Sequence, residues 1–332
     1  MSLLKKIGVM TVVGVLAVSS VAASAATVVR VGHGANEAYH MHRAMLRFKE
    51  VVQEKSGGRF DVQIFPSSQM GPDREMIESV QSGVLQMAVS PASFYSNWDN
   101  SFDTIELPFI YPSKDVALKT VSGPAGDAML KRLGKINLVG LGWLENGVRN
   151  VTNNRREIRT PDDLNGVKLR TMKVPAHMDT FNALGASATP MNFGEVYSAL
   201  QQGVIDGQEN PIALIHSQRF YEVQKFMSLT GHVFTFYIPV VSQDFWHTLS
   251  SEDQELFLEA MSQAQAYQQE LVNAEDSKQL AEIEKAGVKV TKLSPSEIGK
   301  FKSLTESVRQ KYRKSIPSGV YDDWMKAIDN AS

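Results

Sequence analysis

The stretch FDVQIFPSSQMGPDREMIESVQSGVLQMAV, residues 60–89, decides the fold class. Apolar and polar residues alternate over residues 60–65, as they do in a half-buried strand. Pro72 stands where the first turn of a helix tolerates proline, and the helix that it opens ends at Gly83. Residues 85–89 then read as a second strand. This order of strand, helix and strand predicts an α/β fold with parallel strands.

The same order of elements recurs on both sides of this stretch. Residues 28–32 read as a buried strand, and apolar residues at helical spacing follow over residues 39–56. In the second half, ALQQGVID at residues 199–206 repeats the pattern of SVQSGVLQ at residues 79–86. Both read as the end of a helix, a glycine stop and a buried strand. The match is short and coincidence is the alternative, but it fits two lobes built on one plan.

A long helix is expected near the C-terminal end. Residues 252–286 contain neither glycine nor proline, and Ser250 or Ser251 can cap the start of the helix. At 1.5 Å per residue, a continuous helix there would be roughly 50 Å long, which exceeds the width of one lobe. The apolar residues do not hold a heptad, so a helix that bridges two lobes explains the run better than a coiled coil. A break near Asn273 is the competing interpretation.

The first residues predict export from the cytoplasm. Lys5 and Lys6, the apolar residues 7–18 and the small residues 23–25 are typical of a secretory signal peptide over residues 1–25. An N-terminal anchor helix is the alternative, but the apolar run is shorter than the roughly 20 residues that a bilayer requires. We therefore expect a periplasmic protein.

Charge and cysteine content argue against several classes of partner. The formal net charge is −2, and removal of the two lysines in residues 1–25 takes it to −4. No basic tract remains, which argues against nucleic acid and anionic membrane surfaces as partners. The sequence has no cysteine, so the exported chain must be stabilised by burial of a core. With 332 residues it is long enough for two lobes.

Motifs for nucleotides, metals and hydrolytic chemistry are incomplete. VGHGAN at residues 31–36 is placed like a dinucleotide loop, but Glu37 stands where the third glycine belongs. His33, His40 and His42 lie close in sequence, but without a cysteine or an HExxH pattern they read as solvated or cleft-lining residues. No G-x-S-x-G elbow or P-loop is present. We expect no metal and no cofactor, and an enzyme with scattered catalytic residues stays open.

Two arginines on predicted strands suggest an anion site. Arg149 ends the strand-like stretch WLENGVR at residues 143–149, and Arg170 lies at the carboxyl end of GVKLR at residues 166–170. Ligands of open α/β sheets bind at that edge, and the planar fork of an arginine suits a carboxylate. From spacing alone, a surface salt bridge explains either arginine equally well.

A series of short motifs runs through the chain after the N-terminal segment. They are PSSQMG (66–71), GVKLR (166–170), LGA (184–186), TPM (189–191), EVY (195–197), ALQ (199–201), DGQENP (206–211) and FYEVQK (220–225). This ordered set resembles the solute-binding proteins of tripartite ATP-independent periplasmic (TRAP) transporters, the DctP-like family. The resemblance covers essentially all of the chain after the signal peptide.

The resemblance implies a bilobal periplasmic-binding-protein-like fold, in which two α/β lobes surround a ligand cleft and a long helix spans both. We expect residues 27–147 plus 236–275 to form lobe I, and residues 148–235 plus 276–332 to form lobe II. Members of the family use no ATP and perform no chemistry on the solute.

The resemblance also implies a ligand site. Arg170 matches the main carboxylate-clamping arginine of the family, and Arg149 matches a second ligand arginine. Asn210 matches an amide that helps to hold the carboxylate, and Phe193 matches an aromatic residue that lines the cleft.

Two further positions vary within the family and bear on ligand identity. Tyr237, on a returning strand, and Glu37, in the first loop, are placed where ligand hydroxyls are read. Residues 90–93, SPAS, stand where a sialic-acid binder has a glutamate, which argues against sialic acid as the ligand.

These observations predict a solute-binding protein that performs no catalysis. It would capture a small organic carboxylate, either a sugar acid, a dicarboxylate or a keto acid, and deliver it to the integral-membrane TRAP permease subunits. We expect a monomer. An exported enzyme acting on carboxylates and a sensory ligand-binding protein are the alternatives, because one fold can serve several functions.

Overall fold

The computed structural model describes residues 25–332, so the predicted signal peptide lies outside the described residues except for its last residue. The strands are β1 (Thr27–His33), β2 (Phe60–Phe65), β3 (Met87–Pro91), β4 (Leu138–Gly140), β5 (Leu144–Asn153), β6 (Lys168–Thr171), β7 (Ser187–Pro190), β8 (Gly207–Pro211), β9 (Phe226–Ser242) and β10 (Lys289–Lys292). The helices are α1 (His40–Lys55), α2 (Asp73–Gln81), α3 (Lys114–Val121), α4 (Pro124–Arg132), α5 (Pro175–Ala183), α6 (Val196–Gln201), α7 (Ile212–Ser217), α8 (Gln243–Thr248), α9 (Ser251–Lys285), α10 (Pro295–Ser315) and α11 (Ser318–Ala331). Within these residues, no helix combines the length and the apolarity needed to cross a bilayer.

Within the described residues, ten strands form one mixed sheet in the order β2-β1-β3-β9-β5-β8-β6-β7, with β4 and β10 paired to β9. The outer groups β2-β1-β3 and β8-β6-β7 are parallel. The central strands β9 and β5 run antiparallel to each other and to the outer strands beside them. The expectation of parallel strands is therefore confirmed for the outer groups and wrong for the centre. The reason is that the long strand β9 links the two groups directly, whereas parallel neighbours need a crossover connection.

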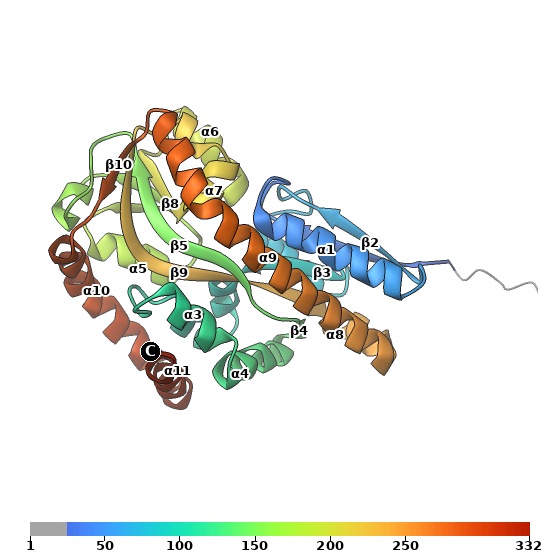
Figure 1. Ribbon diagram of the computed structural model, residues 1–332. Coiled ribbons are helices and arrows are strands. Elements are labelled where there is room, and N and C mark those ends of the chain that lie inside the picture. The colour runs from blue at the N-terminus through green and yellow to red at the C-terminus, as the bar shows by residue number, and fades with distance from the viewer. Residues whose placement is uncertain (1–24) are drawn as a thin grey trace, which may run out of the picture.

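The long helix α9 is continuous over Ser251–Lys285, which confirms the predicted long helix and excludes a break near Asn273. Its 35 residues correspond to about 52 Å at 1.5 Å per residue. Glu275 on α9 pairs with Arg43 on α1 at 2.6 Å, and Glu282 contacts His216 on α7 at 2.7 Å. The helix therefore joins elements from both outer groups of strands, as Figure 1 shows.

The repeated glycine pattern has a structural counterpart in both halves. Gly83 follows α2 and Gly203 follows α6, with φ angles of +74° and +70° that favour glycine. The strands after these turns begin at Met87 and Gly207, later than the sequence pattern predicts. Each of these strands then ends at a proline, at the edge where the candidate site lies.

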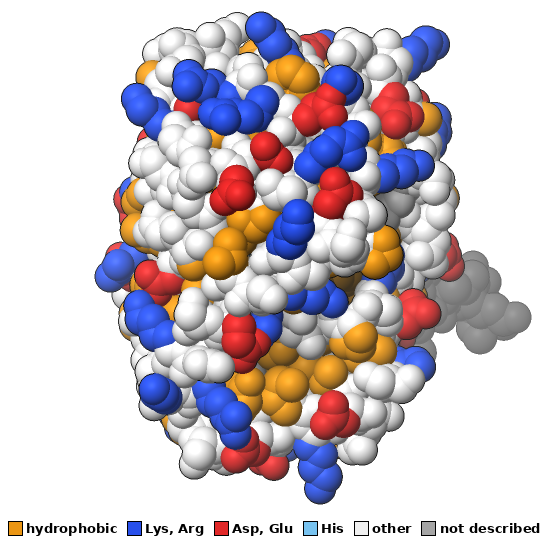
Figure 2. Space-filling model, turned by 90° about the vertical axis from the view of Figure 1, so that its left-hand side faces the viewer, with side chains coloured by type: hydrophobic (Ala, Val, Ile, Leu, Met, Phe, Trp, Pro, Cys, Tyr) orange, Lys and Arg blue, Asp and Glu red, His pale blue; other side chains and the backbone are white. Residues whose placement is uncertain are grey.

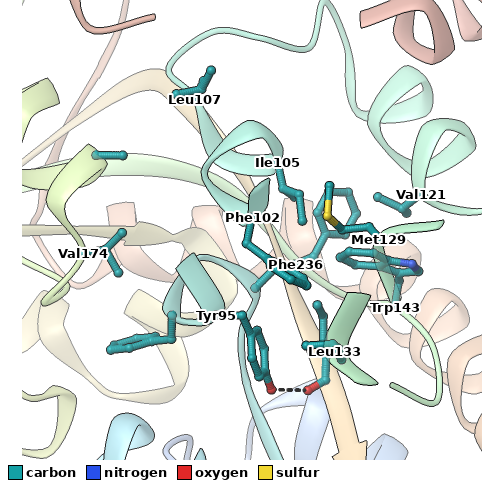
Figure 3. Packing of buried hydrophobic residues seen from close by; sticks show 14 of the residues in the cluster. Tyr95, Phe102, Ile105, Leu107, Val121, Met129, Leu133, Trp143, Val174 and Phe236 are labelled. Atoms are coloured by element: carbon teal, nitrogen blue, oxygen red, sulfur yellow. Dashed lines mark hydrogen bonds between the residues drawn. The ribbon is translucent and has the colours of Figure 1, made fainter. Parts of the chain in front are cut away.

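The largest hydrophobic cluster fixes the central strand β9. The ring of Phe236 packs against that of Trp143 with centroids 5.8 Å apart, and Phe102 and Tyr95 belong to the same cluster, part of which Figure 3 shows. The hydroxyl of Tyr95 donates to the carbonyl oxygen of Ile238 at 3.2 Å. Because side chains alternate along a strand, the burial of Phe236 and Ile238 in this cluster directs Tyr237 to the opposite face.

Charged side chains of both signs are interspersed on the face of the molecule that Figure 2 shows.

The division into lobes at residues 147, 235 and 275 stays a prediction. The C-terminal helix α11, which was expected in lobe II, packs against α3.

Candidate ligand-binding cavity

A small cavity is lined by residues from both outer groups of strands. Its lining consists of Gly34, Ala35, Asp73, Pro91, Phe94, Asn146, Arg149, Arg170, Met172, Phe193, Asn210, Leu214 and Tyr237. Several of these residues stand at the carboxyl ends of β1, β3, β6 and β8, the edge at which open α/β sheets bind ligands.

Arg170 is a buried cation without a carboxylate partner among the described residues. It lies on β6, next to the fully buried Leu169 that faces the core, and only 2% of it is exposed. Its Nε and Nη2 donate to the carbonyl oxygen of Met191 at 3.0 and 2.7 Å, and its third nitrogen, Nη1, is buried with no hydrogen-bond partner. Burial lowers the pKa of Arg170 from 12.5 to about 10, so the side chain stays charged at neutral pH.

Arg149, on β5, is held by Glu209 on β8. Nε and Nη2 of Arg149 donate to the two carboxylate oxygens of Glu209 at 2.5 and 2.8 Å, and both side chains are buried. Burial alone would raise the pKa of Glu209, but Arg149 and a hydrogen bond from His232 at 2.9 Å lower it well below its usual range. Burial lowers the pKa of His232, which keeps this imidazole neutral. The charge of Arg149 is therefore balanced within the protein.

The predicted residues Asn210, Phe193 and Tyr237 also line the cavity. Nδ2 of Asn210 donates one hydrogen to Oε1 of Gln208 at 2.5 Å, so its second hydrogen is available to a ligand. The ring of Phe193 lies 5.7 Å from the guanidinium carbon of Arg170, within cation–π range. Burial raises the pKa of Tyr237, which keeps its hydroxyl protonated and able to donate.

Glu37 is exposed and does not belong to the lining of the cavity. The loop that carries it reaches the cavity through Gly34 and Ala35 instead. The structure thus brings together Arg170, Arg149, Asn210, Phe193 and Tyr237 and leaves Glu37 apart. Their contacts with a ligand stay predictions.

Two polar residues of the cavity were missed by the sequence reasoning. Asp73 is the first residue of α2, and Asn146 lies on β5 three residues before Arg149. Burial raises the pKa of Asp73 from 3.8 to about 6, although Ser90 and the charge of Arg170 act against this effect. The Nδ2 atom of Asn146 is buried and has no hydrogen-bond partner. The position of Asp73 at a helix start that follows a parallel strand was the available signal, because such loops meet at the ligand edge of the sheet.

The three histidines near the N-terminus lie in the core of the protein. Nε2 of His33 lies 3.0 Å from Nδ1 of His42, and Nδ1 of His40 accepts from Gln268 at 2.9 Å. All three are buried, so the expectation of solvated side chains is wrong, whereas His40 does line a second pocket of the protein. Within residues 25–332, no group of three or more histidine, cysteine, aspartate or glutamate residues is arranged to hold a metal ion.

Residues 31–315 match the family model of the bacterial extracellular solute-binding proteins, family 7, known as DctP. A similar curated protein is the 2,3-diketo-L-gulonate-binding periplasmic protein YiaO of Escherichia coli. It is 33% identical over 315 residues, which cover 95% of each chain.

Solved structures agree with this match. The sugar acid binding protein DctPAm of Advenella mimigardefordensis, in complex with galactonate, has a TM-score of 0.90 and 31% identity, covering 92% of this chain and 99% of that one. A TRAP periplasmic solute-binding protein of Shewanella oneidensis with bound succinate has a TM-score of 0.87 and 27% identity, covering 92% and 100%.

The matches confirm the periplasmic-binding-protein-like fold, the extracytoplasmic location and a role in solute binding, as opposed to catalysis. The chain therefore belongs to the DctP family of solute-binding proteins of TRAP transporters.

Proposed function

We propose that this protein captures a small organic acid in the periplasm by pairing the acid's carboxylate with Arg170, and that it delivers the acid to the membrane subunits of a TRAP permease. The observation that carries the proposal is the state of Arg170. It is buried and charged, forms no ion pair among the described residues and has one nitrogen, Nη1, without a hydrogen-bond partner.

An unpaired buried charge is costly, because removal of an ion from water is compensated only by a partner of opposite charge. A ligand carboxylate in the cavity would supply that partner and would accept the hydrogen bond that Nη1 leaves unmade. Arg149 can donate hydrogen bonds to a ligand, but it contributes little net charge, because Glu209 already pairs with it at 2.5 Å. Arg170 should therefore dominate the recognition of the anion.

The relatives are consistent with this assignment. YiaO is named for a keto sugar acid, and the two structural relatives hold galactonate and succinate, all of which carry carboxylates. Their ligands differ in the number of carboxylates and hydroxyls. The chemical class that they share supports an organic acid for this chain.

The test is calorimetric titration of the wild type, Arg170→Lys and Arg170→Ala with galactonate and with succinate. The alanine variant should lose roughly 2–5 kcal/mol of binding free energy for the acid that the wild type binds, because the desolvated carboxylate loses its partner. The lysine variant should also bind more weakly, since a point charge cannot replace a planar pair of donors.

Arg155 provides the matched control, because its side chain is 54% exposed and lies in a surface ion pair with Asp206 at 3.8 Å. Arg155→Ala should bind like the wild type, since such exposed pairs contribute about 0–1 kcal/mol. Unchanged affinity in Arg170→Lys would remove Arg170 from the site and would contradict the proposed binding mode.

A further inference from the structure

The cavity contains a second charged group without an ion-pair partner, the carboxylate of Asp73. Asp73 begins α2, beside the first group of parallel strands, whereas Arg170 ends β6 in the second group. Both line the cavity, and they form no ion pair with each other. A solute in this cavity can therefore contact both residues, Arg170 through an anionic group and Asp73 through a hydrogen-bond donor.

Gly34 leaves the carboxylate of Asp73 open to the cavity. A Cβ atom at residue 34 would lie 3.7 Å from Oδ2 and 3.8 Å from Oδ1 of Asp73. A longer side chain at this position would cover the carboxylate from within the cavity, whose lining includes both residues. The absence of a side chain at residue 34 thus exposes Asp73 to a solute.

Among the described residues that line the cavity, Arg170 is the one cation that no carboxylate of the protein pairs with, so it can pair with one ligand carboxylate. Arg149 and Glu209 neutralise each other, and burial keeps His232 uncharged. Arg170 remains for one carboxylate of the solute. With a pKa of about 6, Asp73 is largely ionised above pH 7, so it would repel a second one.

The other polar groups of the lining fit hydroxyls. Nδ2 of Asn146 is a buried donor without a partner, and the hydroxyl of Tyr237 is held in its protonated form. The carboxylate of Asp73 accepts hydrogen bonds, and a sugar hydroxyl can donate to it and accept from an amide at the same time. A solute with several hydroxyls would therefore satisfy groups that a plain hydrocarbon chain leaves unpaired.

We propose that Asp73 selects acids with a single carboxylate and several hydroxyls, of the aldonate type, over dicarboxylates. This inference rests on the proposed binding of a carboxylate at Arg170. It goes further in assigning hydroxyl groups of the solute to Asp73 and in excluding a second carboxylate from the neighbourhood of Asp73.

Two matched pairs of acids test the selection, because each pair differs only in whether the terminal CH₂OH is oxidised to a carboxylate. The pairs are erythronate with meso-tartrate and galactonate with galactarate. One of the two pairs should have the size that the protein binds. For that pair, calorimetric titration at pH 7.5 should show that the dicarboxylate binds at least tenfold more weakly than the aldonate.

Asp73→Asn should remove the repulsion while it preserves the shape of the side chain. In this variant, the dicarboxylate of that pair should bind at least tenfold more tightly than in the wild type, and the ratio between the two acids should shrink. Asp103→Asn is the matched control, because Asp103 is also a buried carboxyl group whose pKa burial raises to about 6, but it does not line the cavity. It should leave the ratio unchanged.

Two outcomes would overturn the inference in distinguishable ways. A dicarboxylate that binds the wild type as tightly as its aldonate partner, or an equal change of the ratio in both variants, would contradict the role of Asp73 and leave the proposed function intact. No binding of any of the four acids would contradict the proposed function and this inference together.

Discussion

Arg149 and Arg170 line the same cavity in different electrostatic settings. Arg149 is paired with Glu209, and removal of one partner from such a buried pair costs about 3–5 kcal/mol of stability. Arg170 donates hydrogen bonds to the carbonyl oxygen of Met191 and forms no ion pair among the described residues. Arg149 therefore belongs to the framework of the site, and Arg170 provides the charge that a ligand can use.

At the scale of single residues, Asp73 should make the unligated protein less stable at high pH. Its pKa is raised from 3.8 to about 6, so the native state holds this proton more tightly than the unfolded state. The free energy of unfolding should therefore fall as the pH rises from about 4 through 6, and the loss should be complete above that range. Asp73→Asn, which cannot ionise, should gain stability relative to the wild type by about 2 kcal/mol more at pH 8 than at pH 4.5.

Urea denaturation of the unligated wild type and of Asp73→Asn at the two pH values measures this difference. The other titrating groups that surround the cavity, which include Arg170, Tyr237 and Tyr95, are present in both proteins and cancel in the comparison. An equal difference at both pH values would show that burial does not raise the pKa of Asp73.

At the scale of elements, α9 connects the two outer groups of strands through an ion pair with Arg43 on α1 and a hydrogen bond with His216 on α7. Asn273 lies in this helix with an exposed side chain. Asn273→Pro should remove a backbone hydrogen bond and introduce a clash, and so lower the free energy of unfolding by about 3 kcal/mol or more.

The control for this prediction is Asn273→Ala, which keeps the backbone bond and has a better helix propensity, so its stability should stay within about 0.5 kcal/mol of the wild type or rise slightly. Chemical denaturation followed by circular dichroism measures both variants. A proline variant as stable as the alanine variant would show that continuity of α9 contributes nothing to the fold.

At the scale of the whole molecule, the burial of the cavity implies movement. Arg149 and Arg170 are 1% and 2% exposed, so a solute can reach them only if the two sides of the cavity separate. Strand β5 shifts its register against β9 between Glu145 and Gly147 and again between Arg149 and Val151. These irregularities lie beside the cavity, which Asn146 and Arg149 line, and irregularities of this kind disrupt the ladder and bend the strand locally.

Small-angle scattering should therefore show a smaller radius of gyration when galactonate, or another acid that the protein binds, is added. The melting temperature should rise at the same time, with a stabilisation of roughly 2.7 kcal/mol at a hundredfold excess over the dissociation constant. Galactose, which lacks the carboxylate, is the control and should change neither. A tightly bound acid that leaves the scattering unchanged would contradict closure.

Much of the fold could be derived from local patterns in the sequence. Gly83 and Gly203 end their helices as expected because a left-handed turn needs glycine whatever surrounds it. The absence of glycine and proline over residues 252–286 was enough to predict α9, because only such residues break a helix strongly. The family resemblance, and not a local pattern, predicted five residues that do line the cavity.

Tertiary structure alone decided which of these charged residues form ion pairs within the protein and which do not. Arg149 and Glu209 are far apart in the sequence, and they meet because β5 and β8 pair antiparallel. Asp73 and Arg170 face the same cavity through the packing of two separate groups of strands, and Glu37 stays exposed although its loop reaches that cavity. Spacing in the sequence predicts which residue types stand at the ligand edge, but the balance of charge depends on distances between strands, which only the folded chain determines.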